Sequence, residues 1–141
     1  MSSYTVSDVL NRAARRLRII PGGEVLDNED AADALAAYNS MMFGFAAAGL
    51  TLLDDAATPA TYTHAIQAAS AEFPLADQYF DAVWQVFMEK LIGQFPVDAS
   101  VAAGVAVLIS EGWNRLYAAF LDIEESDVSA AGTLPSQTDK W

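Results

Sequence analysis

Residues 77–95 read DQYFDAVWQVFMEKLIGQF, and no other stretch of the chain has so clear a structural pattern. Its large apolar side chains recur every three or four residues, the spacing that gathers them on one face of an α-helix. These side chains are Phe80, Val83, Trp84, Phe87, Met88, Leu91, Ile92 and Phe95. Because proline clashes with the preceding turn of a helix, the pattern predicts a helix that begins near Asp77 and ends before Pro96.

A second helix is predicted near the start of the chain. Thr5, followed three residues later by Asp8, resembles a capping box, in which each residue accepts a hydrogen bond from the backbone of the other. Apolar residues then continue at helical spacing, which predicts a helix to about Arg18. The sequence Pro21-Gly22-Gly23 follows, and we expect it to end this helix.

Two more helices lie before and after the central pattern. Asp27 is a suitable cap for a helix that runs to about Ala48, because its carboxylate can accept hydrogen bonds from unpaired backbone N–H groups. Asp98 or Ser100 can cap the last helix in the same way. This helix is expected to run to about Leu121.

These segments predict an all-α fold, a bundle of about four main helices in one domain over residues 1–121. Within the last helix, Gly104 and Gly112 are interpreted as points of close approach to another helix.

Residues 54–75 contain two prolines and no sustained helical pattern, so we expect a long loop there. Residues 122–141 are mostly small or polar, and they predict an extended C-terminal arm that does not fold alone.

Charge is distributed unevenly along the chain. The net charge is −12, but residues 1–20 contain four arginines and one aspartate, a net charge of +3, which leaves −15 on the other 121 residues. An acidic body repels nucleic-acid phosphates, whose binding requires clustered lysines and arginines. We therefore expect no sequence-specific DNA binding, although DNA can pass such a surface without being held.

Few residues suggest enzyme chemistry. The chain has no cysteine and one histidine, His64, so thiolate and histidine-rich metal sites are excluded and a Ser-His-Asp triad would depend on this one imidazole. A calcium loop starting at Asp27 would need glycine at its sixth position, which is Ala32. The acidic residues there fit the positive end of a helix dipole instead; they are Asp27, Glu29, Asp30 and Asp33. We expect no catalytic residue, no metal and no cofactor, and hence no enzyme.

The chain also lacks a segment that predicts membrane insertion. The longest apolar stretch, Ala99–Ile109, is about half as long as the roughly 20 residues that cross a bilayer. It is interpreted as a buried helix, and no membrane partner is expected.

Some residues outside the apolar patterns are candidates for an interface. The four arginines of the first helix lie largely off its apolar stripe, and Trp113 and Tyr117 lie beside the stripe of the last helix. The C-terminal arm ends in further apolar groups. Since aromatic residues and arginines are common at interface centres, the candidate set is Arg12, Arg15, Arg16, Arg18, Trp113, Tyr117, Leu134, Pro135 and Trp141.

The order of segments carries a resemblance. Thr5–Leu17 reads TVSDVLNRAARRL, Pro21-Gly22-Gly23 follows, and residues 28–42 contain NEDAADAL and YNSMM. Residues 73–79, FPLADQY, lead into the third helix, which ends in LIGQFP. Over residues 5–121 this order resembles the bacteriophage head-to-tail adaptor family, which includes the tail accessory factors that stabilise packaged DNA. Members of that family begin with a helix whose C-terminal end is basic. A short turn follows, and then a second helix of the type D-A-L-x-x-L-N-x-M-L.

The resemblance implies a structural virion protein that joins the portal to the tail and takes part in viral genome packaging and ejection. It implies a ring of about twelve copies, bound to the portal protein on one side and to a tail hub or nozzle protein on the other. DNA would lie in the lumen without sequence-specific binding. The expected location is the neck or tail of the virion, and the host cytoplasm during assembly.

Two alternatives of other classes remain open. A virion-associated cell-wall hydrolase would use paired carboxylates, for which Glu72, Asp77, Glu89 and Glu111 lie near apolar residues in the sequence. An acidic DNA-mimic inhibitor would bind a basic protein through its negative surface. The hydrolase requires a cleft with a carboxyl group of raised pKa, and the mimic requires a stable monomer.

Overall fold

The computed structural model describes residues 3–52 and 66–121. Four helices and one short 3-10 helix lie in these ranges. They are α1 (Val6–Arg16), α2 (Asn28–Ala47), η1 (Asp77–Tyr79), α3 (Phe80–Gln94) and α4 (Ala99–Phe120). The predicted all-α bundle of four main helices is therefore confirmed, and each helix lies within a few residues of its predicted position.

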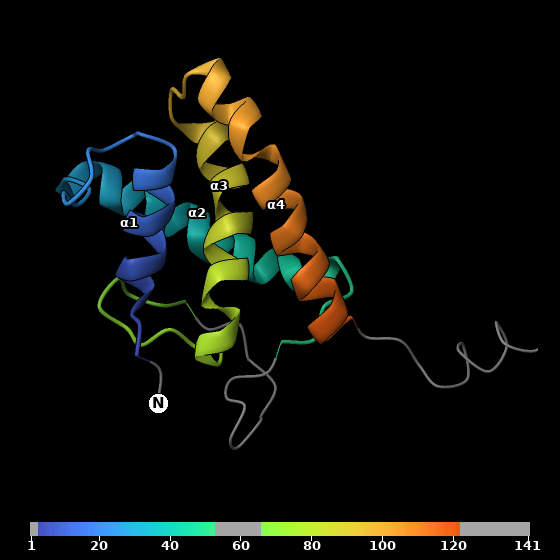
Figure 1. The fold of residues 1–141 in the computed structure, drawn as a ribbon. Coiled ribbons are helices and arrows are strands. Elements are labelled where there is room, and N and C mark those ends of the chain that lie inside the picture. Colours follow the sequence, from blue (N-terminus) through green and yellow to red (C-terminus); the bar gives the residue numbers. More distant parts are fainter. Residues whose placement is uncertain (1–2, 53–65, 122–141) are drawn as a thin grey trace, which may run out of the picture.

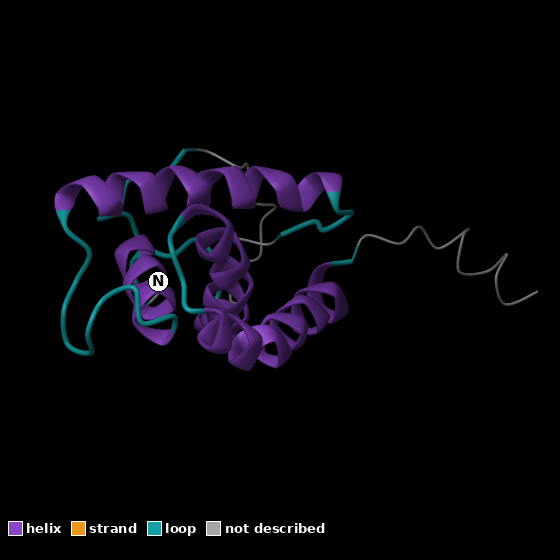
Figure 2. Cartoon of the chain, turned by 90° about the horizontal axis from the view of Figure 1, so that it is seen from above, coloured by secondary structure: helices purple, strands orange, loops and turns teal. Residues whose placement is uncertain are grey.

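The helices form two layers. α1, α3 and α4 stand side by side in one layer, and α2 runs across the back of that layer (Figure 1). The view from above shows α2 along one edge, with the other three helices on the same side of it (Figure 2). The crossing arrangement lets one apolar face of α2 cover the layer of three.

α3 is the centre of the core. It packs most extensively against α4, next against α1 and then against α2. The predicted apolar face is buried at Phe80, Val83, Trp84, Phe87, Met88 and Leu91, but so are Ala82, Gln85 and Val86 on the other sides of the helix. Burial on several sides follows from having neighbours on several sides, and it makes α3 the element on which the others are arranged.

The predicted capping box of α1 is confirmed. The Thr5 hydroxyl accepts a hydrogen bond from the Asp8 backbone at 3.3 Å, and the Asp8 carboxylate accepts one from the Thr5 backbone at 2.8 Å. The predicted end of the helix is wrong by two residues. Arg18 adopts a left-handed backbone conformation with φ of 60°, and the Ile19 N–H donates to the Ala14 carbonyl, a Schellman cap. α1 thus ends before the Pro21-Gly22-Gly23 turn is reached.

The caps of α2 and α4 also follow from the sequence. The Asp27 carboxylate accepts a hydrogen bond from the Asp30 backbone at 2.8 Å and caps α2. Of the two candidates for α4, Asp98 is the cap, because its carboxylate accepts from both the backbone and the hydroxyl of Ser100 at 2.9 Å.

The part of the predicted loop that the structure describes is residues 66–75. It contains no helix or strand, and hydrogen bonds hold it to two other segments. The N–H groups of Val6 and Ser7 donate to the carbonyls of Ala71 and Ala69 at 2.9 and 2.8 Å. On the other side, the Asn39 side chain of α2 exchanges two hydrogen bonds of 3.0 Å with the Gln67 backbone. This segment therefore joins the entry of α1 to α2.

The two helical glycines that were expected at close contacts differ. A Cβ atom at Gly112 would lie 2.8 Å from the carbonyl oxygen of Ala82 and 2.9 Å from Cβ of Gln85, so α3 and α4 approach closely there. At Gly104 a Cβ would meet nothing within 4 Å, so the prediction of a close approach at Gly104 is wrong. Gly104 instead faces an open hollow.

This difference gives a matched pair of variants. Gly112→Ala should destabilise the fold by on the order of 1–2 kcal/mol, because a Cβ against backbone costs about 1–3 kcal/mol and alanine's better helix propensity returns only about 1 kcal/mol. Gly104→Ala should stabilise it by roughly 0.5–1 kcal/mol, since only the propensity changes. Urea denaturation followed by circular dichroism measures both, and equal shifts in the same direction would contradict the close approach.

Candidate functional site: the arginine end of α1

The four arginines of the first helix and its cap separate into two pairs. Arg12 and Arg15 line a hollow of about 260 Å³ with Asp8 and residues near the N-terminus. Arg16 and Arg18 line a second hollow of about 210 Å³ against α4. The separation arises because α1 passes between two surfaces, one formed with the chain's N-terminal segment and one with the start of α4.

Arg12 and Arg15 make contacts inside the molecule. The Arg12 guanidinium lies 5.7 Å from the centre of the Phe80 ring and 5.8 Å from that of Trp84, both on α3. A cation at this distance is attracted by the negative face of an aromatic ring. Arg15 donates a 2.7 Å hydrogen bond from Nε to the Glu24 carbonyl and so fastens the connection between α1 and α2. These two arginines therefore have structural roles.

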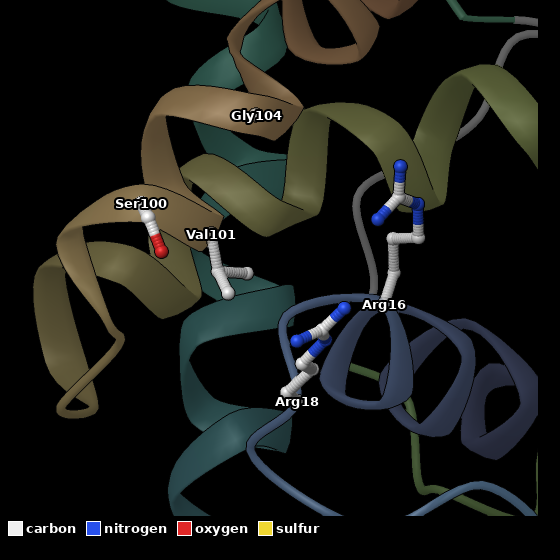
Figure 3. A pocket seen from close by; sticks show the side chains of 5 residues that line it. All are labelled: Arg16, Arg18, Ser100, Val101 and Gly104. Atoms are coloured by element: carbon white, nitrogen blue, oxygen red, sulfur yellow. The ribbon is translucent and has the colours of Figure 1, made fainter.

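Arg16 and Arg18 point towards α4. Figure 3 shows both side chains extending from the end of α1 and its cap, and the hollow that they line is completed by Ser100, Val101 and Gly104 of α4. Both arginines are exposed. Neither guanidinium has a hydrogen bond or ion pair with another residue of the described ranges. Within these ranges Arg18 is attracted by Asp98 without a hydrogen bond, so the N–H donors of both guanidinium groups are not used there.

The backbone at Arg18 is unusual for its residue type. Left-handed conformations at a helix end are typically occupied by glycine, because a side chain there costs roughly 1–2 kcal/mol. Here the position carries an arginine that lines the hollow. Strained positions of this kind are common at binding sites, and the cap fixes the direction in which Arg18 leaves the backbone.

One carboxylate lies near the hollow. Hydrogen bonds from the backbone and then the hydroxyl of Ser100 lower the pKa of Asp98, and the positive charge of Arg18 adds a smaller contribution in the same direction, against a small opposing effect of burial. Asp98 therefore stays ionised to a lower pH than an ordinary aspartate. Its hydrogen bonds are made with Ser100, so within the described ranges it accepts none from the guanidinium groups of the hollow.

The aromatic candidates on α4 lie side by side at a ring separation of 5.7 Å. Trp113 is half-buried, donates from Nε1 to the Glu89 carboxylate at 3.2 Å, and meets Phe45 of α2 edge-on at 5.7 Å. It thus links α2, α3 and α4. Tyr117 is exposed. An interface role for this pair stays a prediction, as does that of Leu134, Pro135 and Trp141, which lie outside the described residues.

The acidic residues that were weighed for chemistry are dispersed. Glu72, Asp77, Glu89 and Glu111 are all exposed, so none has the apolar surroundings that a general acid needs. Among residues 3–52 and 66–121, no three histidine, aspartate or glutamate side chains are arranged to hold a metal ion. His64 lies outside these ranges. No helix in the described part of the chain is long and apolar enough to cross a membrane.

Sequence reasoning identified the arginines but not the residues opposite them. The spacing of residues along α1 shows that the arginines lie outside its apolar stripe. That Ser100, Val101 and Gly104 lie opposite them depends on how α4 packs, which the sequence does not show. No local signal set Arg18 apart from the others, because the predicted helix ran to about Arg18 and the structure shows it to end at Arg16. Comparison with family models, with curated proteins and with solved structures finds no match to this chain.

The two arginine pairs should respond differently to loss of charge. Arg12→Gln with Arg15→Gln should lower the free energy of unfolding by about 1–2 kcal/mol, because a cation–π contact and a charged hydrogen bond are lost. Arg16→Gln with Arg18→Gln should change it by less than about 0.5 kcal/mol, since within the described ranges the change removes only a weak, exposed attraction between Arg18 and Asp98. Urea midpoints of the two double variants test this, and an equally large loss in both would contradict the division.

Proposed function

We propose that this protein is a structural virion protein without enzymatic activity, a subunit of the adaptor ring that joins a phage portal to the tail. The observation that carries the proposal is the positive hollow at the end of α1, whose Arg16 and Arg18 are exposed, unpaired within the described ranges and set on an acidic chain. Charges that make no hydrogen bond within the described part of a subunit are well suited to contacts between subunits.

Charge on the rest of the molecule fits the same role. Outside residues 1–20 the chain carries −15. A ring with a negative lumen repels DNA phosphates and lets the duplex slide during ejection, whereas a positive lumen would hold it. Such a ring retains packaged DNA when its lumen is closed and passes the DNA when its lumen is open. Neither task requires a sequence-specific contact.

The helical fold supports the proposal through the segment order. The resemblance to head-to-tail adaptors rests on a basic-ended first helix, a short turn and a second helix with an acidic start. α1, the Pro21-Gly22-Gly23 turn and α2 follow one another in that order. The portal protein, a tail hub or nozzle protein and further copies of the chain are the proposed partners, in the virion neck and, during assembly, in the host cytoplasm.

Electron microscopy of the purified protein mixed with the portal protein encoded by the same genome tests this function. We expect a cyclic complex of about twelve copies seated on the portal, because a portal template imposes the rotation that closes head-to-tail contacts into a ring. A portal from an unrelated phage serves as the control. Absence of binding to the cognate portal at low salt would contradict the adaptor role.

The C-terminal arm gives a separate prediction. A chain truncated after Leu121 should keep its helical circular dichroism and its melting temperature, because the Thr51 N–H already ties the end of α2 to the Phe120 carbonyl at 2.8 Å. It should bind the portal at least tenfold more weakly, because apolar groups at the end of a polar segment are typical of arms that fold on a partner. Equal binding by truncated and full-length protein would show that the arm does not take part.

A further inference from the structure

We propose that the hollow lined by Arg16, Arg18 and Ser100 is a binding site for carboxylate side chains of a second copy of this chain, supplied by the acidic first turns of its α2. The inference rests on the ring proposed above and identifies the contact between neighbouring subunits. The inference concerns contacts between copies of this chain, so it can be contradicted even if the protein binds the portal.

The hollow has the shape and chemistry that a carboxylate requires. Its volume of about 210 Å³ is several times the roughly 30 Å³ that one water occupies in the liquid, so a carboxylate fits with some solvent. Two arginines line it, Arg16 at the last residue of α1 and Arg18 in the cap that follows (Figure 3). Arginine presents planar, paired N–H donors that match the two oxygens of a carboxylate.

Within the described ranges the hollow has no acidic side chain in its lining. Asp98, which is attracted by Arg18, makes its hydrogen bonds with Ser100. The acidic start of α2 belongs to the back layer, whereas the hollow lies between α1 and α4 in the front layer (Figures 1 and 2). We therefore assign the carboxylate that enters the hollow to another molecule.

The start of α2 is the complementary surface on that molecule. Asp27, Glu29 and Asp33 are exposed and Asp30 is half-buried, and no lysine or arginine occurs in the sequence between Arg18 and Lys90. Asp27 is engaged as the helix cap, which leaves Glu29 and Asp33, one turn apart, to reach outward. This is the densest exposed negative charge in the described ranges that lacks a basic neighbour along the sequence.

Two different surfaces of one chain that fit each other produce a head-to-tail contact. Such a contact repeats from copy to copy and closes into a ring when the rotation per copy allows it. The attraction between the arginines and the carboxylates is electrostatic and partly exposed to solvent. Added salt therefore weakens it, because the screening length falls to about 10 Å at 0.1 M salt.

A substitution at Gly104 can place a side chain of the same molecule in the hollow. A side chain at this position meets open space, so Gly104→Glu places a carboxylate in the hollow without distorting α4. We expect sedimentation at low salt to show concentration-dependent self-association of the wild type, at least tenfold weakened by Gly104→Glu. Gly104→Ala should associate like the wild type, and Gly104→Gln, equal in size to glutamate but uncharged, should be weakened less than Gly104→Glu.

The outcomes separate the inference from the proposed function. A wild type that stays monomeric at low salt, or a Gly104→Glu protein that associates normally, overturns the inference even if both bind the portal. Loss of portal binding in Gly104→Glu with unchanged self-association would likewise overturn it, because the occupant would then be a portal carboxylate.

A charge exchange identifies the partner surface. Arg16→Glu with Arg18→Glu, and separately Glu29→Lys with Asp33→Lys, should each abolish self-association. An equimolar mixture of the two proteins should restore it, because each then offers the other a complementary surface. Arg115→Glu, an exposed charge change elsewhere on α4, is the control and should associate normally. Circular dichroism of each variant verifies folding, and a mixture of folded proteins that stays monomeric overturns the pairing.

Discussion

The close approach of α3 and α4 at Gly112 is the constraint on which the rest of the structure depends. Because a Cβ atom at this position would stand 2.8 Å from the Ala82 carbonyl oxygen, the two helices are held at a separation that only glycine permits. α3 is then covered by α4 on one side, by α1 on another and by α2 behind. The same packing that buries α3 brings the start of α4 level with the end of α1.

The hollow between α1 and α4 is a consequence of this arrangement. α1 ends at a Schellman cap, and α4 begins at the Asp98 cap, so two helix ends of opposite polarity meet there. A helix C-terminus attracts positive charge and a helix N-terminus attracts negative charge. Asp98 satisfies the second preference, whereas Arg16 and Arg18 follow the first and extend towards solvent. An anion bound in the hollow is the proposal that follows from this arrangement.

Energetic magnitudes agree with the proposed role of these charges in assembly. An exposed ion pair contributes about 0–1 kcal/mol, too little to matter for one folded domain. In the proposed ring the same contact would recur at every interface, so its contribution would be multiplied while each pair stays reversible.

The sequence by itself determined the helices, their caps and the apolar face of α3, because hydrophobic spacing and capping are local properties that neighbouring residues settle among themselves. It also identified the arginines that lie off the core of α1. It did not determine that α3 is buried on several sides, that Gly112 but not Gly104 is a close contact, or that Arg12 and Arg15 contact α3 and the Glu24 carbonyl while Arg16 and Arg18 face α4. These features depend on the crossing and separation of helices distant in the chain. Only the tertiary structure decides them, because the surface that meets each residue belongs to a different helix.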